Sequence, residues 1–344
     1  MDIRLEHVWR LSEQRDPRQI FPRVMQLLVL VEETGSLAAV CEQEGLSYRH
    51  AWGLLQEGAD LFETPLVEMT RGKGTRLSAL GQRLIWAERR ARARLQQISD
   101  SVACEVAQDM ALALGTDGSG LQVRASHCFA MEHLFDTLGH QYPNNKLLWC
   151  NSSDAVRALR SGYCDLAGFH ECPDVAVSQD QDDFDPDEHM LILLAQRQLG
   201  LLLPAGNPQK IYTLSDLTRR ETRWVHWQRG TAMRDVFDAL LERHQLCDTR
   251  WDQPAPPENA HLGIASCIAG GKADAGFGLE TAARRFGLDF VPLTSNRYVL
   301  GINKARMKQR QLQTLQGILN KPAFRQAIDA LPGYDASQTG EVLI

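Results

Sequence analysis

The stretch GSLAAVCEQEGLSYRHAW, residues 35–52, decides how the N-terminal part of this chain folds. Ser36 follows a glycine and can cap a short helix over 37–43, because a serine hydroxyl satisfies a free backbone N–H of the first turn. Gly45 ends this helix, since glycine adopts the left-handed conformation of a helix C-terminus without strain. Ser47 then caps a second helix. Two short helices joined by a turn that contains glycine are typical of a helix-turn-helix.

The flanking residues complete a small domain. Apolar residues recur at steps of three and four over 20–34, which predicts a preceding helix. Short strand patterns over 66–70 and 75–77 flank a basic turn at 71–74 (RGKG), and two strands joined by a tight turn predict a β-hairpin. The sequence therefore predicts a winged helix-turn-helix domain over residues 1–77.

The second helix of this motif carries side chains suited to reading DNA. The first residues of a recognition helix contact base edges in the major groove. Arg49 is our candidate for a bidentate contact to guanine, and the basic hairpin would meet phosphates or the minor groove. A surface helix with incidental polar residues is the alternative. The candidate DNA-binding residues are Ser36, Ser47, Tyr48, Arg49, His50, Trp52, Arg71, Lys73 and Arg76.

A long helix, capped by Ser78, is expected over residues 78–114. Its apolar residues recur at steps of three and four and are Leu80, Leu84, Ala87, Ala91, Leu95, Ile98 and Val102. This seam is close to the heptad pattern through which two copies of a helix pair. The alternative is a helix packed on its own domain. The length of the seam favours a linker and dimerisation helix, hence a homodimer, and leaves a tetramer open.

Composition and charge are those of a globular protein of more than one domain. The chain has 344 residues, 44% hydrophobic and 23% charged, with a net charge of −6. Segment 71–94 holds eight cations and one anion, whereas 180–188 holds six acidic residues. For a nucleic-acid binder this distribution matters more than the sum. Two solvated faces without a partner are the alternative.

Nothing in the sequence indicates export. No stretch approaches the roughly 18 consecutive apolar residues of a membrane helix, and the first residues lack a signal pattern. The eight cysteines form no Cys-x-x-Cys pair, which agrees with a reducing compartment. We expect a cytoplasmic protein without membrane contact.

Beyond a glycine-rich linker at 115–120, strand and helix patterns alternate, which predicts an α/β domain over 121–344 with parallel sheets flanked by helices. Three segments repeat a strand, a polar turn and a helix start: 125–129, 150–154 and 228–232. Helix starts favour anions, because they present free N–H groups and partial positive charge. Turns that meet where strands end predict a cleft for a small anionic effector.

The N-terminal motif resembles a known family. GSLAA, GLSYRHAW and LSALGQRL, at 35–39, 45–52 and 77–84, resemble the winged-helix domain of the molybdate-responsive ModE-like regulators and, more distantly, that of LysR-type regulators. The resemblance implies homodimeric binding to double-stranded operator DNA. ModE-like proteins carry a different, barrel-like sensor, so the effector is not carried over from this half.

The C-terminal half is similar to the periplasmic-binding-protein-like domain of type II topology, as in molybdate- and tungstate-binding proteins. The segments that carry this similarity are 154–170, 200–208, 228–234 and 273–278. The similarity implies two lobes that close on a ligand and are joined by crossovers near 195–199 and 291–298. We expect lobe I over about 121–195 and 298–344, and lobe II over about 199–291.

The candidate effector-binding residues are Ser126, His127, Cys128, Ser152, Ser153, His170, Arg229, Gly230, Thr231 and Tyr298. Tyr298 is included by resemblance alone, which implies that it hangs from the second crossover into the cleft. Asn151 stands where relatives commonly have glycine, and His127 and Cys128 accompany Ser126. These departures leave the effector open between molybdate or tungstate and a small carboxylate such as formate.

The sequence thus predicts a transcriptional regulator whose operator binding responds to a small anion and whose targets are molybdenum- or formate-related genes. RNA polymerase is a further partner left open. We expect no enzyme, cofactor or metal, because the histidines and cysteines lack ligand spacings such as His-Glu-x-x-His. The alternative is a constitutive architectural DNA-binding protein whose second domain only assembles oligomers.

Overall fold

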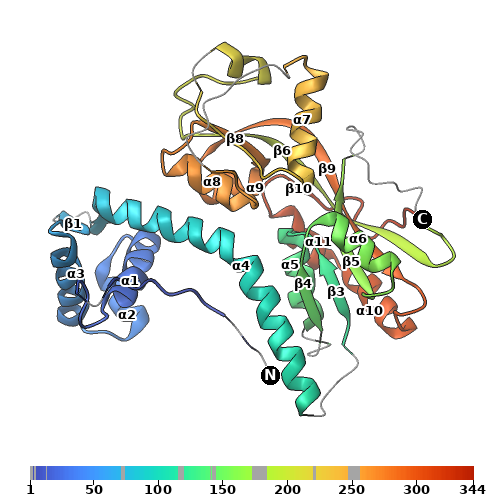
Figure 1. The fold of residues 1–344 in the computed structure, drawn as a ribbon, viewed down its shortest axis with the longest axis horizontal. Coiled ribbons are helices and arrows are strands. Elements are labelled where there is room, and N and C mark those ends of the chain that lie inside the picture. The colour runs from blue at the N-terminus through green and yellow to red at the C-terminus, as the bar shows by residue number, and fades with distance from the viewer. Residues whose placement is uncertain are drawn as a thin grey trace. The chain divides into compact units, whose positions relative to one another are not determined.

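The computed structural model describes two compact units. One, the N-terminal unit, is Glu6–Arg92, and the other, the C-terminal unit, is Ala93–Ile344 with Met1–Leu5. The described residues are 3, 5–12, 14–70, 74–114, 120–139, 141, 145–172, 184–219, 222–246 and 256–344. The boundary between the units falls within the long helix α4 (Figure 1).

The N-terminal unit is a winged helix-turn-helix, as the sequence predicts. Its elements are α1 (Phe21–Thr34), α2 (Leu37–Glu44), α3 (Tyr48–Phe62), β1 (Val67–Thr70), β2 (Gly74–Leu77) and the first turns of α4 (Ala79–Ala113). Ser36 and Ser47 cap α2 and α3 by accepting backbone hydrogen bonds from Ala39 (3.3 Å) and His50 (3.2 Å). The capping serines therefore set where both helices begin.

The hairpin is attached to the turn between α1 and α2. The backbone N–H of Thr75 donates to the Gly35 carbonyl at 3.1 Å. Gly74 has φ +82°, and a Cβ atom there would lie 2.5 Å from the same carbonyl oxygen. Only glycine allows this approach, so β2 begins at a defined place beside the turn between α1 and α2.

In the structure, the apolar seam predicted for α4 has two parts, one packed against a core and one exposed. Leu80 and Leu84 pack against the core of the N-terminal unit, so for them the alternative of packing within one domain is correct. Farther along, large apolar side chains are 39–66% exposed, and these are Leu95, Ile98, Val102, Val106, Met110 and Leu114. The exposed seam therefore begins later than the sequence suggests and extends farther.

The C-terminal unit is built on one eight-stranded sheet of order β4-β3-β5-β9-β6-β8-β7, with β10 paired to β6. In its first half lie β3 (Gln122–Ala125), α5 (Phe129–Gly139), β4 (Lys146–Trp149), α6 (Ser152–Arg160), β5 (Leu166–Glu171) and β6 (His189–Leu203). In the middle follow η2 (Leu214–Arg219), β7 (Trp224–Val225), α7 (Ala232–Arg243), α8 (His261–Ala269) and β8 (Ala275–Leu279). The chain ends with α9 (Glu280–Arg285), β9 (Asp289–Asn303), α10 (Gln309–Leu319), α11 (Pro322–Asp329) and β10 (Tyr334–Asp335).

The α/β prediction is confirmed, but the prediction of parallel sheets is correct only at the two ends. Strand β3 pairs in parallel with β4 and β5, and β7 pairs in parallel with β8. The centre is antiparallel, because β5, β6 and β9 run in alternating directions. The two apolar runs 191–195 and 199–203, whose patterns each predict a separate strand, belong to the single strand β6. The polar residues between the two apolar runs interrupt the hydrophobic pattern, but they continue the strand and its pairing with β9.

Strands β6 and β9 are each 15 residues long and run through the whole unit (Figure 1). Their pairing is irregular between Leu193 and Ala195 and again between Leu199 and Gly200. Bulges of this kind bend a strand and increase its twist. The two irregularities flank residues 195–199, the segment expected as the first crossover. We call this segment, together with the β9 residues that pair with it, the crossover region. The lobe boundaries themselves stay a prediction.

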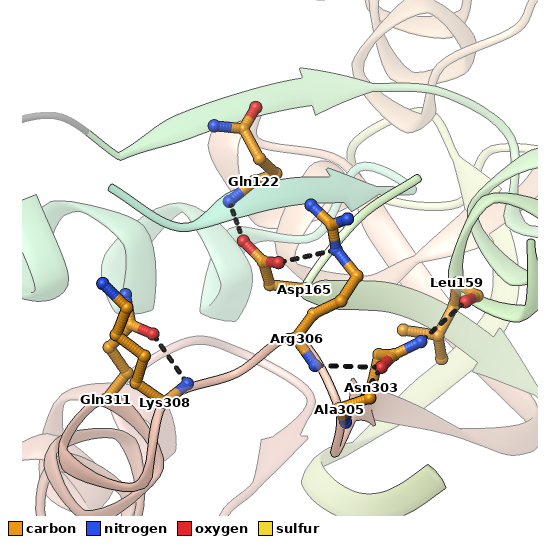
Figure 2. Close-up of polar contacts among 8 residues, drawn as sticks. All are labelled: Gln122, Leu159, Asp165, Asn303, Ala305, Arg306, Lys308 and Gln311. Carbon is orange, nitrogen blue, oxygen red and sulfur yellow. Dashed lines mark hydrogen bonds and ion pairs between the residues drawn. The ribbon is translucent and has the colours of Figure 1, made fainter. Parts of the chain in front are cut away.

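Polar contacts join the start of β3 to the segment that follows β9. The Asp165 carboxylate accepts hydrogen bonds from the Gln122 backbone N–H (2.7 Å) and from Arg306 Nε (2.9 Å). Figure 2 shows these bonds beside Asn303, whose side chain accepts from the backbone of the following turn. The start of β3 and the end of β9 are thereby held to one another.

Within the described residues, no helix taken singly has the length and apolarity of a membrane span. Helices α1 and α2 pass that test only as a pair, bent by 117° at their junction. Their apolar residues are those that form the core of the N-terminal unit.

Candidate functional site

The exposed start of α3 presents polar side chains in the way a recognition helix requires. Ser47, Tyr48, Arg49 and His50 are all exposed, whereas Ala51 and Leu55 are buried in the core. Arg49 forms no ion pair with another residue of the described part of the chain. Its guanidinium is therefore available for a base edge or a phosphate.

The start of α3 lies beside the hairpin. The Tyr48 hydroxyl is 3.6 Å from the sulfur of Met69 on β1. Arg76 on β2 is exposed, so its cation extends the surface that α3 begins. Arg71 and Lys73 lie outside the described residues. Trp52, in contrast, is half-buried and packs against the domain core.

In the C-terminal unit, five polar side chains form a row across one face of the sheet at the crossover region. Cross-strand partners lie on the same face of a sheet. His170 on β5 faces Tyr298 on β9, and Arg197 on β6 faces Asn296 of β9 on one side and Tyr334 of β10 on the other. We call these five residues the crossover cluster.

Two of the predicted turns converge on this cluster. The Nδ1 atom of His170 lies 3.3 Å from Ser126 Oγ and 3.0 Å from Ser152 Oγ. The Tyr298 hydroxyl donates to the Ser126 carbonyl at 2.5 Å. A Cβ atom at Gly168 would lie 2.4 Å from that hydroxyl, so a glycine is needed for Tyr298 to lie there. Of the three turns predicted to meet, the first two thus contribute residues beside this cluster.

The central residue of the cluster is Arg197, which sequence reasoning missed. It is 1% exposed, and its Nε donates to Asn296 Oδ1 at 3.0 Å. Neither of its Nη atoms makes a hydrogen bond of ordinary length and angle with a described residue. The Cys128 thiol and the phenols of Tyr298 and Tyr334 act on the guanidinium, and the Tyr334 hydroxyl does so also as a side-chain hydrogen-bond partner. None of these is a carboxylate, so the described residues leave a buried cation without a counter-ion.

Further buried nitrogen atoms of the cluster are unpaired. They are Asn296 Nδ2 and His170 Nε2. Because arginine Nε–H can only donate, the Asn296 atom that faces it is the oxygen, and Nδ2 is a free donor. His170 Nδ1 can donate to one serine hydroxyl or accept from one, so the role of Nε2 depends on the tautomer. The unpaired atoms on Arg197 and Asn296 are donors.

The imidazoles near the cluster are neutral at physiological pH. Burial, and then the nearby Arg197 cation, lower the pKa of His170 to about 3. Burial, followed by the charge of Arg197, also lowers the pKa of His261, at the start of α8, well below its usual value. Arg197 therefore supplies the fixed positive charge of the cluster.

Not all of the other predicted effector residues lie at the crossover cluster. Cys128 is buried, with its sulfur 3.6 Å from the Tyr334 hydroxyl. His127 pairs with Glu132 at 2.7 Å. Ser153 is exposed beside the buried Ser152.

The third predicted turn stays apart. Arg229 and Gly230 are exposed, and Thr231 caps α7 by accepting from the Arg234 N–H at 3.4 Å. No hydrogen bond between described residues joins this turn to the crossover cluster. The capping interpretation, which explains each turn singly, is sufficient here.

The comparison with known proteins agrees with this architecture. The profile of the family described as "PBP superfamily domain" matches residues 138–320. The chain belongs to this family. That match contains His170 and Arg197, and it ends beyond Asn296 and Tyr298 of β9.

Two curated relatives are similar to parts of the chain. The uncharacterized protein YvgK of Bacillus subtilis is 29% identical over 198 residues, which are 56% of this chain and 63% of that protein. The chain thus spans less than two thirds of YvgK. An uncharacterized protein of Clostridium pasteurianum, described as in the 5′ region of a 2Fe-2S ferredoxin gene, is 36% identical over 85 residues. That match covers 24% of this chain and 75% of the relative.

Solved structures of full-length regulators are loosely similar. HypT from Salmonella typhimurium, titled a hypochlorite-specific LysR-type transcriptional regulator, is 12% identical with a TM-score of 0.49, over 86% of this chain and 96% of that chain. An H2O2-bound OxyR mutant of Corynebacterium glutamicum is 13% identical with a TM-score of 0.43, over 85% and 89%. With both TM-scores below 0.5, no residue role is carried over from them.

Helix α4 is attached to the PBP superfamily domain near the third turn. Arg94 Nε and Nη2 donate to the two carboxylate oxygens of Glu258 at 2.6 and 2.8 Å. Glu258 is fully buried, and its backbone bonds to those of His226 (2.9 Å) and Gln228 (2.8 Å). Bidentate pairs of this kind fix direction as well as distance.

A second contact attaches α4 to the opposite end of the sheet. The Ser101 hydroxyl lies 3.3 Å from the carbonyl oxygen of Trp149 and 3.2 Å from its backbone nitrogen. Trp149 ends the edge strand β4, and its ring lies 5.5 Å from that of His127. Ser101 and Arg94 are two helical turns apart, roughly 10 Å along one face of α4. One helix thus contacts both halves of the PBP superfamily domain.

Proposed function

We propose that this protein is a DNA-binding transcriptional regulator whose PBP superfamily domain binds a small anionic effector. The observation that carries the proposal is the buried Arg197 guanidinium, whose charge no carboxylate of the described residues offsets. Burying an uncompensated charge is unfavourable by several kcal/mol. A bound anion would remove this penalty, and so the cluster is suited to capture one.

The N-terminal unit supplies the DNA-binding half of the proposal. The exposed Tyr48, Arg49 and His50 begin a capped helix beside a hairpin that carries Arg76. A helix of this kind fits the major groove, while a cationic hairpin contacts phosphates and adds salt dependence. A regulator of this type would act where the DNA is, in the cytoplasm.

The exposed apolar seam of α4 supports a homodimer. Its six side chains, from Leu95 to Leu114, are too many and too regularly spaced for a solvent-exposed helix. A second copy of the same helix has the matching pattern. A dimer would present two reading helices to a two-fold symmetric operator.

The two attachments of α4 provide a route from the effector to the DNA. Arg94 holds the half that contains Glu258, and Ser101 holds the edge strand β4. If a bound anion brings the two halves closer together, α4 must move for the hydrogen bonds of both attachments to be kept. The free energy available is the difference in anion affinity between the two states.

The proposal is tested by measuring DNA binding and anion binding on the same full-length protein. Operator fragments selected from random DNA are titrated by fluorescence anisotropy with and without formate, molybdate, tungstate and sulfate. We expect at least one anion to change the dissociation constant by fivefold or more. DNA binding that no anion changes would favour the constitutive architectural alternative, and absence of DNA binding would refute the proposal.

A further inference from the structure

We infer that Tyr48 and Met69 together form an apolar contact for the methyl group of a thymine in the major groove of the operator. The inference rests on the proposed function, because it names a base that the same DNA-reading surface would recognise. It is drawn from two exposed side chains that lie against each other at the start of α3. We call them the Tyr48–Met69 patch.

The patch is an exception to the burial of apolar residues in the N-terminal unit. Among the described residues of this unit, three large apolar side chains are exposed, and they are Val8 (58%), Tyr48 (43%) and Met69 (53%). Two of the three adjoin, since the Tyr48 hydroxyl lies 3.6 Å from the Met69 sulfur. An apolar residue exposed singly is ordinary, whereas two that adjoin on a polar surface form a patch that a partner can cover.

The hairpin holds Met69 at this place. Met69 is the cross-strand partner of Thr75, and cross-strand partners lie on the same face of a sheet. Thr75 is buried, and its Oγ1 accepts a hydrogen bond from the Leu37 backbone N–H at 3.3 Å, at the start of α2. Met69 therefore lies on the face of the hairpin that is turned toward the helix-turn-helix, and it is nevertheless 53% exposed.

The surroundings of the patch favour DNA as the partner that covers it. Arg49 and His50 follow Tyr48 on α3 and are exposed, and the first turn of this helix holds no acidic residue. An apolar patch bordered by a cation suits a surface that combines negative charge with methyl groups. The major groove of DNA is such a surface, and in it thymine presents a C5-methyl group that the other three bases lack.

The chemistry of the two side chains suits this contact. Methionine is flexible and polarizable, and so it adapts to an irregular apolar surface. The Tyr48 hydroxyl donates to the Met69 sulfur, which is a weak acceptor, and it can exchange this bond for a stronger acceptor on a base. Tyr48 is the first residue of α3, and the first residues of a recognition helix contact base edges. Because Arg49 is next in the chain, the thymine would lie in the same half-site as the guanine contacted by Arg49.

Replacement of single thymines by deoxyuridine in a selected operator tests the inference, because it removes the C5-methyl group and leaves base pairing intact. The affinity of the full-length protein for each replaced operator is measured by fluorescence anisotropy. Loss of one methyl group from an apolar contact weakens binding about fourfold, and we expect this loss at one or more thymines of the half-site. If no replacement weakens binding by as much as twofold, the inference is overturned and the proposed DNA-binding regulator stands. Absence of binding to any DNA would overturn both.

Three variants locate the contact. Met69→Ala removes the apolar side chain, and we expect it to bind the thymine and deoxyuridine operators equally. Met69→Leu keeps an apolar side chain of similar volume, and we expect it to retain the preference for thymine. Val8→Ala, at the exposed apolar residue outside the patch, is the matched control and should retain the preference in full. A preference that persists in Met69→Ala, or that is lost as completely in Met69→Leu or Val8→Ala, would contradict the inference.

Discussion

Arg49 and Arg197 are two arginines in opposite surroundings. Arg49 projects from the exposed start of α3, where water solvates its charge. Arg197 is 1% exposed in the middle of an eight-stranded sheet, and no described residue supplies a carboxylate to it. Arg94 lies between these extremes, because its side chain is 36% exposed and pairs with the fully buried Glu258.

The difference shows that the burial of a charged side chain, rather than its presence, indicates a function. An exposed arginine is stable without a partner, so its presence alone does not identify a ligand. A buried arginine is retained only if something offsets the loss of hydration. The exposed cations therefore support DNA binding only together with their helix and hairpin, whereas the burial of Arg197 by itself supports the proposal of a bound anion.

The largest expected effect is the loss of anion binding in Arg197→Met. Methionine fills a similar volume without charge, so we expect affinity for the preferred anion to fall at least a hundredfold. Because the unpaired charge is gone, we also expect the ligand-free protein to gain about 1–3 kcal/mol in the free energy of unfolding. Calorimetric titration and urea denaturation measure both quantities. A ligand-free protein that becomes less stable would indicate that Arg197 is paired by a residue outside the described part.

Arg49→Ala should weaken specific operator binding by about 1–3 kcal/mol, or roughly tenfold to a hundredfold. A bidentate base contact is lost, while the exposed position leaves the fold unchanged. Anisotropy titration with operator and with unrelated DNA separates the two effects. Arg23→Ala, an exposed arginine on α1, is the control and should alter only the non-specific component. An equal loss in both variants would show that α3 is not the reading helix.

Arg94→Ala should destabilise the protein by about 2 kcal/mol. Removal of one partner from a fully buried pair costs about 3–5 kcal/mol, but water can reach the partly exposed Arg94 position and reduces this penalty. Arg157→Ala, which breaks the exposed 2.8 Å pair with Asp154, is the control and should change stability by less than about 1 kcal/mol. Urea denaturation measures the difference.

The same Arg94→Ala variant sharpens the coupling proposal. We expect anion affinity to persist while the anion no longer changes operator affinity, because α4 has lost one attachment. Anisotropy titrations with and without the anion check this. Full retention of the anion effect on DNA binding would rule out Arg94 as part of the route.

The smallest effect at neutral pH concerns His170, whose pKa is lowered to about 3 by burial and then by Arg197. Between about pH 6.5 and 3 the unfolded chain binds a proton that the folded protein does not, so stability falls as pH falls. The expected slope approaches about 1.4 kcal/mol per pH unit for this group. His170→Asn, which does not titrate, should show a flatter decline between pH 6 and 4 in urea denaturation. An identical slope in both proteins would place His170 in contact with water.

The N-terminal unit could be predicted from sequence because its signals are local. Ser36, Gly45 and Ser47 define where helices start and stop within a few residues, and the observed bounds agree with that pattern. Apolar periodicity likewise identified α4, although it did not distinguish Leu80 and Leu84, which pack within the domain, from the exposed seam beyond them.

The crossover cluster depended on tertiary structure for a physical reason. Ser126, Ser152 and His170 could be proposed from polar turns and resemblance, but Arg197 stood between two apolar runs and looked like a break in a strand. Its burial results from pairing with Asn296 and Tyr334, which lie about 100 and 140 positions farther along the chain. The sequence alone determined the capped helix α3, the hairpin with its basic turn and the α/β class, because those follow from neighbouring residues. Only the folded sheet decided which charge would lose its water, since desolvation depends on residues that are distant in sequence and adjacent in space.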